Sequence, residues 1–273
     1  MRGDEDEIEV ISRRVARGTE LSEASDDFLV AEEPLEIRVG GVSLAVVMRT
    51  PGADAALVRG FLITERIAPT PEAIVSVREC TTVPFPEAEG NVYLATLAEG
   101  VHLDTERLRR NLFASSSCGI CGKASIESAM QVSDGLPPGP EIRLETIHAL
   151  IPALRKTQVV FDATGGLHAA GGFDAGGALL ASFEDIGRHN AVDKVVGALA
   201  ATGRRADILV VSGRVSFEIV QKALAARIPA VVAVSAPSAL AVRLAAQSGI
   251  TLCAFARGDR VAVYTHPERL RTN

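Results

Sequence analysis

Short apolar runs alternate with helical patterns through the last third of the chain, and this alternation constrains the fold more than any other feature. Strands are predicted at residues 208–211, 230–234 and 250–255, with helices at 215–226 and 237–247 between them. Because each run is apolar along its whole length, its strand has to be buried on both faces. The alternation therefore predicts an α/β protein whose helices cover both sides of a sheet.

The preceding segment predicts how this sheet begins. A helix is predicted at 144–156, and a helix with apolar residues at i, i+3, i+4 and i+7 is predicted at 187–200. Between them, strands at 167–173 and 178–183 are joined by a Gly-containing turn. No glycine-rich dinucleotide or Walker A motif is present where a nucleotide-binding α/β unit needs one. This order of elements predicts a cytidine-deaminase-like three-layer αβα sandwich.

The first part of the chain predicts a smaller α+β domain. Gly40-Gly41 between two alternating runs is a strong hairpin signal. The expected elements are strands at 35–39, 42–50, 74–77 and 91–97 and helices at 53–67 and 104–113.

The chain is expected to divide at changes of composition. Residues 1–30 form a polar, acidic arm, either loose or an edge element, and 31–134 form the small domain with a cysteine loop and its helix. Residues 135–143 contain a Gly- and Pro-rich stretch that marks a linker. Residues 144–273 are the deaminase-like domain.

Charge and apolar content limit the partners. A net charge of −6 and a pI near 5.5 argue against nucleic acid or an anionic membrane as a bulk partner. No apolar run approaches 20 residues, so no membrane span is expected. Four cysteines in 273 residues with a large core indicate a reducing, cytoplasmic setting.

Cys118-Gly119-Ile120-Cys121 is the segment with the clearest chemistry. The run behind it favours a helix, so both sulfurs are expected at or just before a helix N-terminus, where the thiolate is stabilised. A structural zinc site would need a second pair of ligands, and the isolated Cys80 and Cys253 do not supply one. Cys253, in an apolar run, is expected to be a buried small residue. A thioredoxin-like motif fits poorly because a helix, and not a strand, is predicted before the loop.

Polar segments follow the predicted strands, at the edge of a sheet where ligands bind. They are residues 164–168, 184–190, 212–216, 235–238 and 255–260. Arg188, Arg214, Arg257 and Arg260 are candidates for phosphate binding, and Asp259 could accept hydrogen bonds from a guanine edge.

Each of these segments also has a structural interpretation. Residues 257–260 could be a solvated turn, and Ser235 and Ser238 could cap a helix. Glu218 and Lys222 have the spacing of a helix-surface pair. Structural roles could also explain four other polar residues. His168 and His189 could form structural hydrogen bonds, and Glu184 and Asp185 could complement a helix dipole.

Three strings together resemble the FdhD family, the formate dehydrogenase accessory sulfurtransferases. They are Ser116 to Lys123 around the two cysteines, Glu184-Asp-Ile-Gly-Arg-His-Asn-Ala-Val-Asp-Lys194, and Ser212-Gly213-Arg214. The resemblance runs from about Pro34 to His266, nearly the whole chain. The family has a deaminase-like core, but the positions of the zinc ligands of deaminases carry Gly187-Arg188-His189 and Ser212-Gly213-Arg214 here, so no resident metal is expected.

The resemblance implies a sulfur relay. A cysteine desulfurase would pass sulfane sulfur to Cys118 as a persulfide, and Cys121 would act as relay or resolving thiol. The sulfur would go to the molybdenum cofactor, bis(molybdopterin guanine dinucleotide), for formate dehydrogenase. The resemblance also implies a homodimer. The residues implied to bind the cofactor are Phe255, Ala256, Arg257, Gly258, Asp259, Arg260, Arg188, His189 and Arg214.

Two other functions remain open. One is a cofactor chaperone that delivers the molybdenum cofactor without covalent sulfur transfer. The other is a thiol–disulfide oxidoreductase, which would need both Cys118 and Cys121.

Overall fold

A six-stranded sheet forms the centre of the molecule. The computed structural model describes residues 7–17, 19–83, 85–101 and 135–272. The strands run in the order β11-β10-β12-β13-β14-β15. Their bounds are β10 His168–Phe173, β11 Leu179–Asp185, β12 Ile208–Val211, β13 Ala230–Ala233, β14 Thr251–Arg257 and β15 Arg260–Thr265. Strands β12, β13 and β14 are parallel, whereas β10 is antiparallel to both β11 and β12 and β15 is antiparallel to β14.

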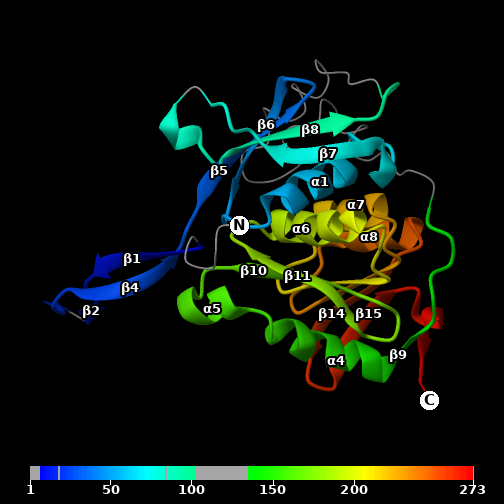
Figure 1. Ribbon diagram of the computed structural model, residues 1–273. Coiled ribbons are helices and arrows are strands. Elements are labelled where there is room, and N and C mark those ends of the chain that lie inside the picture. The colour runs from blue at the N-terminus through cyan, green and yellow to red at the C-terminus, as the bar shows by residue number, and fades with distance from the viewer. Residues whose placement is uncertain (1–6, 18, 84, 102–134, 273) are drawn as a thin grey trace.

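Helices cover both faces of this sheet, as the alternation in the sequence predicts (Figure 1). One face packs against α6 (Arg188–Ala201), α7 (Phe217–Ala225) and α8 (Ala239–Gln247), and the other against α4 (Leu144–Arg155). In the parallel strands, neighbouring residues belong to the two different cores: Leu209 and Val211 face α6 and α7, and Ile208 and Val210 face α4. The prediction of an α/β fold with helices on both sides is confirmed.

A second sheet lies above α1 (Asp54–Thr64) in Figure 1. Its strand order is β6-β5-β8-β7. The bounds are β5 Glu33–Val39, β6 Val42–Arg49, β7 Ile74–Glu79 and β8 Val92–Leu97. The predicted hairpin is present, and both turn glycines, Gly40 and Gly41, have positive φ. Helix α1 ends three residues before the predicted end because Arg66, at φ 57°, leaves the helical conformation.

Two glycines let α1 cross α6 at very short range. A Cβ on Gly60 would lie 1.8 Å from the backbone oxygen of Asp193, and a Cβ on Gly197 would lie 1.9 Å from the backbone oxygen of Ala56. Only hydrogen fits at either place. As a result, the apolar residues of the second sheet, α1, α6 and one face of the six-stranded sheet form one continuous core.

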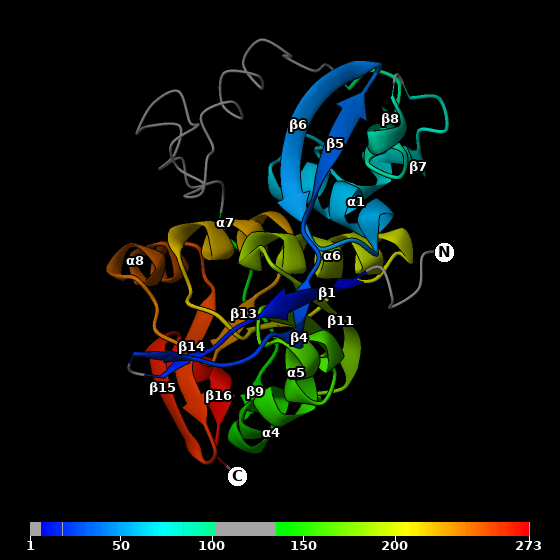
Figure 2. The same ribbon diagram turned by 90° about the vertical axis from the view of Figure 1, so that its left-hand side faces the viewer.

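The predicted arm contains a two-stranded sheet. Strands β1 (Ile8–Arg13) and β4 (Ser25–Val30) pair antiparallel, with the short β2 (Ala16–Arg17) and β3 (Glu20–Leu21) near the turn. In Figure 2 this sheet passes in front of the six-stranded sheet, beside α5.

The remaining elements are short. Among the described residues they are α5 (Val159–Thr164), β9 (Ile142–Arg143), which pairs with β16 (Leu270–Arg271), and 3₁₀ turns at Pro71–Ala73, Pro86–Ala88 and Pro267–Arg269. The helix expected at 104–113 and the Cys118–Cys121 loop lie outside the described residues.

Candidate functional site

The ends of five strands meet at one edge of the six-stranded sheet. His168, the first residue of β10, lies opposite Asp185, the last of β11. Val211 at the end of β12 lies opposite Ala233 at the end of β13, and β14 runs parallel to β13. The polar segments found in the sequence therefore occupy a common edge, which we call the site edge: residues 168, 187–189, 212–216, 235–238 and 255–260.

Backbone hydrogen bonds hold two loops of the site edge together. The N–H of Val215 donates to the oxygen of Ala236 at 3.1 Å, and the N–H of Ser238 donates to the oxygen of Val215 at 2.9 Å. The Ser238 hydroxyl accepts from Ala241 N–H and caps α8, so its predicted capping role is confirmed. Ser235 does not cap this helix; its backbone oxygen accepts from Phe255 N–H at 3.4 Å.

Arg188 and Arg214 give the site edge positive charge. Arg188 is the first residue of α6, and its Nε is buried without a hydrogen-bond partner among the described residues. Neither arginine forms an ion pair with any described residue. Both lie close enough to His168 that, after burial, their charges help to lower the pKa of that histidine. A Cβ on Gly213 would lie 3.2 Å from His168 Nδ1, so the glycine keeps a gap beside this group.

His189 is the neutral member of the site edge. Burial, and then the charges of Lys222 and Arg188, lower its pKa to about 3. Its Nε2 lies 3.9 Å from Glu218 Oε2 and has no hydrogen-bond partner in the described part of the chain. The expected hydrogen-bonded role is therefore wrong for this nitrogen. A neutral imidazole with an unsatisfied nitrogen can accept or donate one hydrogen bond to a ligand.

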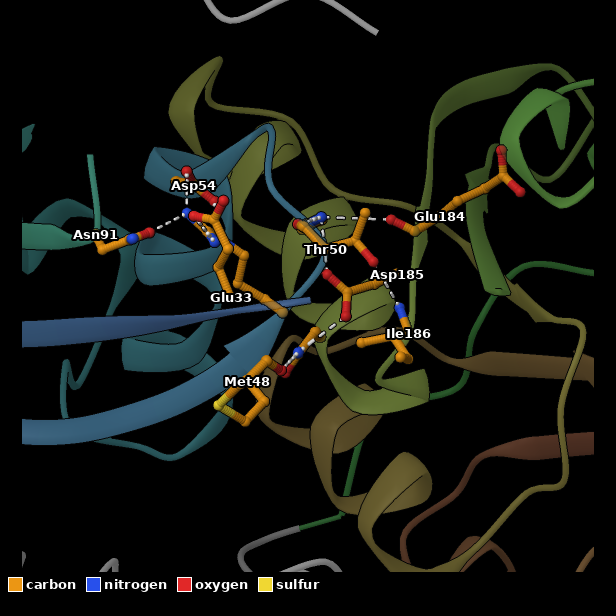
Figure 3. A network of polar contacts seen from close by, with 11 residues as sticks. Glu33, Met48, Thr50, Asp54, Asn91, Glu184, Asp185 and Ile186 are labelled. Atoms are coloured by element: carbon orange, nitrogen blue, oxygen red, sulfur yellow. Dashed lines mark hydrogen bonds and ion pairs between the residues drawn. The ribbon is translucent and has the colours of Figure 1, made fainter. Parts of the chain in front are cut away.

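Several residues of segment 184–194 bind other parts of the protein. Figure 3 shows Asp185 and Ile186 beside Thr50, which follows β6, and the Ile186 N–H donates to the Thr50 hydroxyl at 3.1 Å. The Asp185 carboxylate is fully buried, lies 2.8 Å from Lys194 Nζ and accepts from Gly187 N–H. Lys194 also donates to the backbone oxygen of Thr50 at 2.9 Å, and Asn190 donates to that of Met48 at 2.8 Å. These contacts fix the end of β6 against the beginning of α6.

A second group of buried charges continues this junction. Lys222 Nζ on α7 lies 2.8 Å from Asp193 Oδ2 on α6 and 2.9 Å from Glu65 Oε1 after α1. Thr64 donates to Asp193 Oδ1 at 2.7 Å. The predicted surface pair of Glu218 with Lys222 is wrong, because Lys222 faces the interior while Glu218 faces His189. We call this junction the seam; its polar residues are Thr50, Thr64, Glu65, Asp185, Asp193, Lys194 and Lys222.

Glu184 has a separate structural role. Its two carboxylate oxygens accept from the N–H groups of Phe161 and Val160 at 2.8 and 3.0 Å, in the first turn of α5. The predicted helix-terminus role is correct in kind, but the helix is α5 and not α6.

Residues 255–260 form the β14–β15 hairpin at one end of the site edge. Phe255 is 46% exposed and has a positive φ of 52°. Arg257, Asp259 and Arg260 are exposed and have no ion-pair partner among the described residues. Ala256 is buried in the core beneath α4, so only its backbone could touch a ligand.

The two described cysteines are unsuited to sulfur transfer. Cys253 is fully buried, as predicted, and burial raises the pKa of its thiol to about 12. Cys80 is nearly buried and donates to the oxygen of Thr82 at 3.2 Å. Cys118 and Cys121 lie outside the described residues. In the described ranges no cluster of three or more His, Cys, Asp or Glu could hold a metal ion, and no helix is long and apolar enough to cross a bilayer.

Comparisons with known proteins identify the family of this fold and site. The sequence model of the FdhD/NarQ family matches residues 30–271. The chain is 47% identical to "Sulfur carrier protein FdhD" of Mycolicibacterium paratuberculosis, covering 96% of this chain and 100% of that one. It is 49% identical to the protein of the same name from Mycobacterium tuberculosis, covering 89% and 91%. This chain belongs to the FdhD/NarQ family.

A solved structure shares the fold. It is a crystal structure of a proposed formate dehydrogenase accessory protein from Desulfotalea psychrophila. The TM-score is 0.73 at 22% identity, and the match covers 97% of this chain and 99% of that chain.

Proposed function

We propose that this chain is a sulfur carrier that receives sulfane sulfur from a cysteine desulfurase and passes it to the molybdenum cofactor of formate dehydrogenase. The observation that carries the proposal is the family match, which spans the C-x-x-C loop, together with relatives at 47% and 49% identity that are named sulfur carriers. The burial of Cys80 and Cys253 supports assigning the chemistry to Cys118 and Cys121. A reducing cytoplasm suits such thiols.

The first proposed step is a thiol exchange without net oxidation. The Cys118 thiolate attacks the terminal sulfur of a desulfurase persulfide, so that one S–S bond forms as another breaks. The desulfurase thiolate leaves, and Cys118 carries the persulfide.

In the second proposed step, Cys121 acts as the resolving thiol that releases the sulfur from Cys118. Its thiolate attacks the inner sulfur of the Cys118 persulfide, the two cysteines form a disulfide, and hydrosulfide leaves toward the metal of the cofactor. A dithiol reductant then restores both thiols. In a relay role the terminal sulfur moves from Cys118 to Cys121, a step that is itself redox-neutral. Release of that sulfur as hydrosulfide then takes two electrons from a dithiol reductant, which is oxidised to a disulfide.

We further propose that the site edge binds the nucleotide end of this cofactor, which is the cargo of the protein. Arg188 and Arg214 have no carboxylate partner among the described residues, and the unsatisfied Nε of Arg188 can bind a phosphate oxygen. Asp259 at the hairpin tip would accept from guanine. The strand order β11-β10-β12-β13-β14, with an antiparallel first pair, supports a deaminase-like sandwich for this unit.

The decisive experiment is mass spectrometry after incubation with a cysteine desulfurase and cysteine, with alkylation to trap persulfides. We expect added sulfur on the 118–121 peptide that reductant removes and that Cys118→Ala abolishes. The double variant Cys80→Ser and Cys253→Ala is the matched control and should load normally. A wild-type chain that takes up no sulfur from an active desulfurase would contradict the proposal.

The arginines of the site edge, which form no ion pair with a described residue, also favour the second candidate, a cofactor chaperone. Cys118→Ala separates the two. Loss of formate dehydrogenase activation with cofactor binding kept supports sulfur transfer, whereas unchanged activation supports the chaperone.

A further inference from the structure

Helices α6 and α7 face each other through two pairs of an acidic and a basic side chain, one close and one open. In the inner pair, Asp193 Oδ2 and Lys222 Nζ lie 2.8 Å apart and belong to the seam. His189 and Glu218 stand four residues earlier on the same two helices, about one turn nearer the site edge. His189 Nε2 and Glu218 Oε2 are 3.9 Å apart, too far for a hydrogen bond. We call His189 and Glu218 the outer pair.

The outer pair is mostly withdrawn from water, yet polar atoms around it lack partners. The side chains of His189 and Glu218 are 24% and 12% exposed. His189 Nε2 and the hydroxyl of Ser216 are buried without a hydrogen-bond partner in the described part of the chain. Ser216 stands at the N-cap of α7, but its side chain makes no capping hydrogen bond. Because a buried polar atom without a partner costs free energy, a ligand at the outer pair would stabilise this group.

The charges at the outer pair disfavour a phosphate and suit a neutral ring. The Glu218 carboxylate repels an anion. The imidazole beside it is neutral, because burial and then the charges of Lys222 and Arg188 lower its pKa to about 3. A carboxylate accepts from two neighbouring N–H donors, and a neutral imidazole or a hydroxyl can donate to an oxygen next to them. The matching ligand has a carbonyl oxygen, a ring N–H and an amino group in a row, which is the edge of an aminopyrimidinone.

The strand order places the outer pair beyond the residues proposed for phosphate. The hairpin at 255–260 follows β14, and Arg214 follows β12, two strands away. Neighbouring strands are about 4.8 Å apart, so these two points are separated by about 10 Å along the site edge. His189 is next to Arg188 at the start of α6, which follows β11 at the far end of the same order. A ligand with one ring at the hairpin and phosphates at the arginines would therefore have its next ring at the outer pair.

We propose that Glu218 and His189 bind the aminopyrimidinone edge of a ring. Glu218 accepts from the ring N–H and the amino group, and His189 Nε2 donates to the ring oxygen. The cargo named under the proposed function, on which this inference rests, carries such an edge in its guanine and again in its pterin. Because the hairpin is assigned to guanine, the pterin is the ring expected at the outer pair.

Fluorescence titration with free pterin tests this recognition in the full-length chain. Lumazine is the matched ligand, because it has an oxygen in place of the amino group. The wild type should bind pterin about tenfold more tightly than lumazine, and Glu218→Gln should lose this preference together with about tenfold in pterin affinity. Glu145→Gln is the control: it changes an exposed glutamate in the first turn of α4, on the other face of the sheet, and should bind both ligands as the wild type does.

A parallel titration with guanosine diphosphate and inosine diphosphate identifies the ring. Inosine lacks the amino group of guanine. A loss in Glu218→Gln that is confined to pterin supports the proposal with the pterin at the outer pair. A lost preference for guanosine over inosine diphosphate supports it with guanine there instead. If Glu218→Gln changes neither preference, or if the wild type does not distinguish pterin from lumazine or guanosine from inosine diphosphate, the proposal is overturned.

Persulfide loading of the wild type separates this inference from the proposed function. The same preparation is incubated with a cysteine desulfurase and cysteine, and the 118–121 peptide is examined for added sulfur. Sulfur uptake without any ring preference overturns the role of the outer pair and leaves sulfur transfer standing. A ring preference that depends on Glu218, in a chain that takes up no sulfur, supports the outer pair and contradicts sulfur transfer.

Discussion

The seam and the site edge share the segment 184–194, yet their charged residues differ in whether they have partners. At the seam, Asp193 and Lys222 are buried and each meets an opposite charge or a hydroxyl. Among the described residues, Arg188 and Arg214 at the site edge meet no carboxylate, and the buried Nε2 of His189 has no hydrogen-bond partner. A satisfied buried charge needs no ligand, whereas an unsatisfied one does. Contacts within the protein therefore satisfy the buried charges of the seam, whereas a bound anion would satisfy the arginines of the site edge.

The largest effect on stability is expected for Lys222→Met. It leaves Asp193 buried without its cation, and breaking such a pair costs about 3–5 kcal/mol. Chemical denaturation would measure this loss. The double variant with Asp193→Leu should recover part of it, and Glu141→Gln, which breaks an exposed pair with Arg271, should change nothing measurable. If Lys222→Met were as stable as the wild type, the buried pair of Lys222 with Asp193 would not stabilise the fold, and the contrast between the seam and the site edge would be wrong.

The next effect is expected for Gly197→Ala. The new Cβ would meet the backbone of Ala56, so α1 and α6 must separate; overpacking of this kind costs roughly 1–3 kcal/mol, against a gain of about 1 kcal/mol in helix propensity. Gly135→Ala is the matched control, because the nearest described atom to its Cβ is 3.5 Å away. Equal thermal midpoints for the two variants would contradict the close crossing.

The third effect appears only when the pH is lowered. The pKa of His189 is lowered to about 3 in the folded protein, so between pH 6.5 and 3 the unfolded chain binds a proton that the folded one does not. Stability from this group is therefore lost as pH falls below about 6.5, by at most about 1.4 kcal/mol per pH unit. His189→Gln should flatten the pH profile of the free energy of unfolding; parallel profiles would show that this imidazole is not held neutral.

The smallest effect on stability is expected for Arg188→Gln. Because Arg188 forms no ion pair with a described residue and its Nε has no described hydrogen-bond partner, the free energy of unfolding should stay within about 0.5 kcal/mol. Affinity for guanosine diphosphate, measured by calorimetry, should fall about tenfold. Arg205→Gln is the control. Arg205 lies on the loop that enters β12 at the opposite edge of the sheet, so this variant should bind guanosine diphosphate with wild-type affinity. A stability loss comparable to that of Lys222→Met would place Arg188 with the seam.

The sequence predicts those features that depend on neighbours along the chain. Apolar runs such as 208–211 and 230–234 give the strands, and Gly40-Gly41 gives the hairpin. It also predicts which segments meet at the site edge, because parallel strands end on one side.

Long-range pairing is what local spacing cannot supply. Spacing alone pairs Lys222 with Glu218, four residues away, but its partners Asp193 and Glu65 are 29 and 157 positions distant. The same limit hides the division within segment 184–194, where Asp185 and Lys194 hold the seam while Arg188 faces the edge. Side-chain direction in the folded helix decides each case.

The hydroxyl of Thr64 and the ammonium of Lys222 meet across 158 positions of sequence. Contacts of such high sequence separation form late, because the loop between them must close first. During synthesis from the N-terminus, the side chains of α1 that pack against α6 and α7 would therefore stay exposed until those two helices have left the ribosome. The seam thus sets a time order for folding, and a chain stopped before residue 222 would be a natural target for chaperones and proteases.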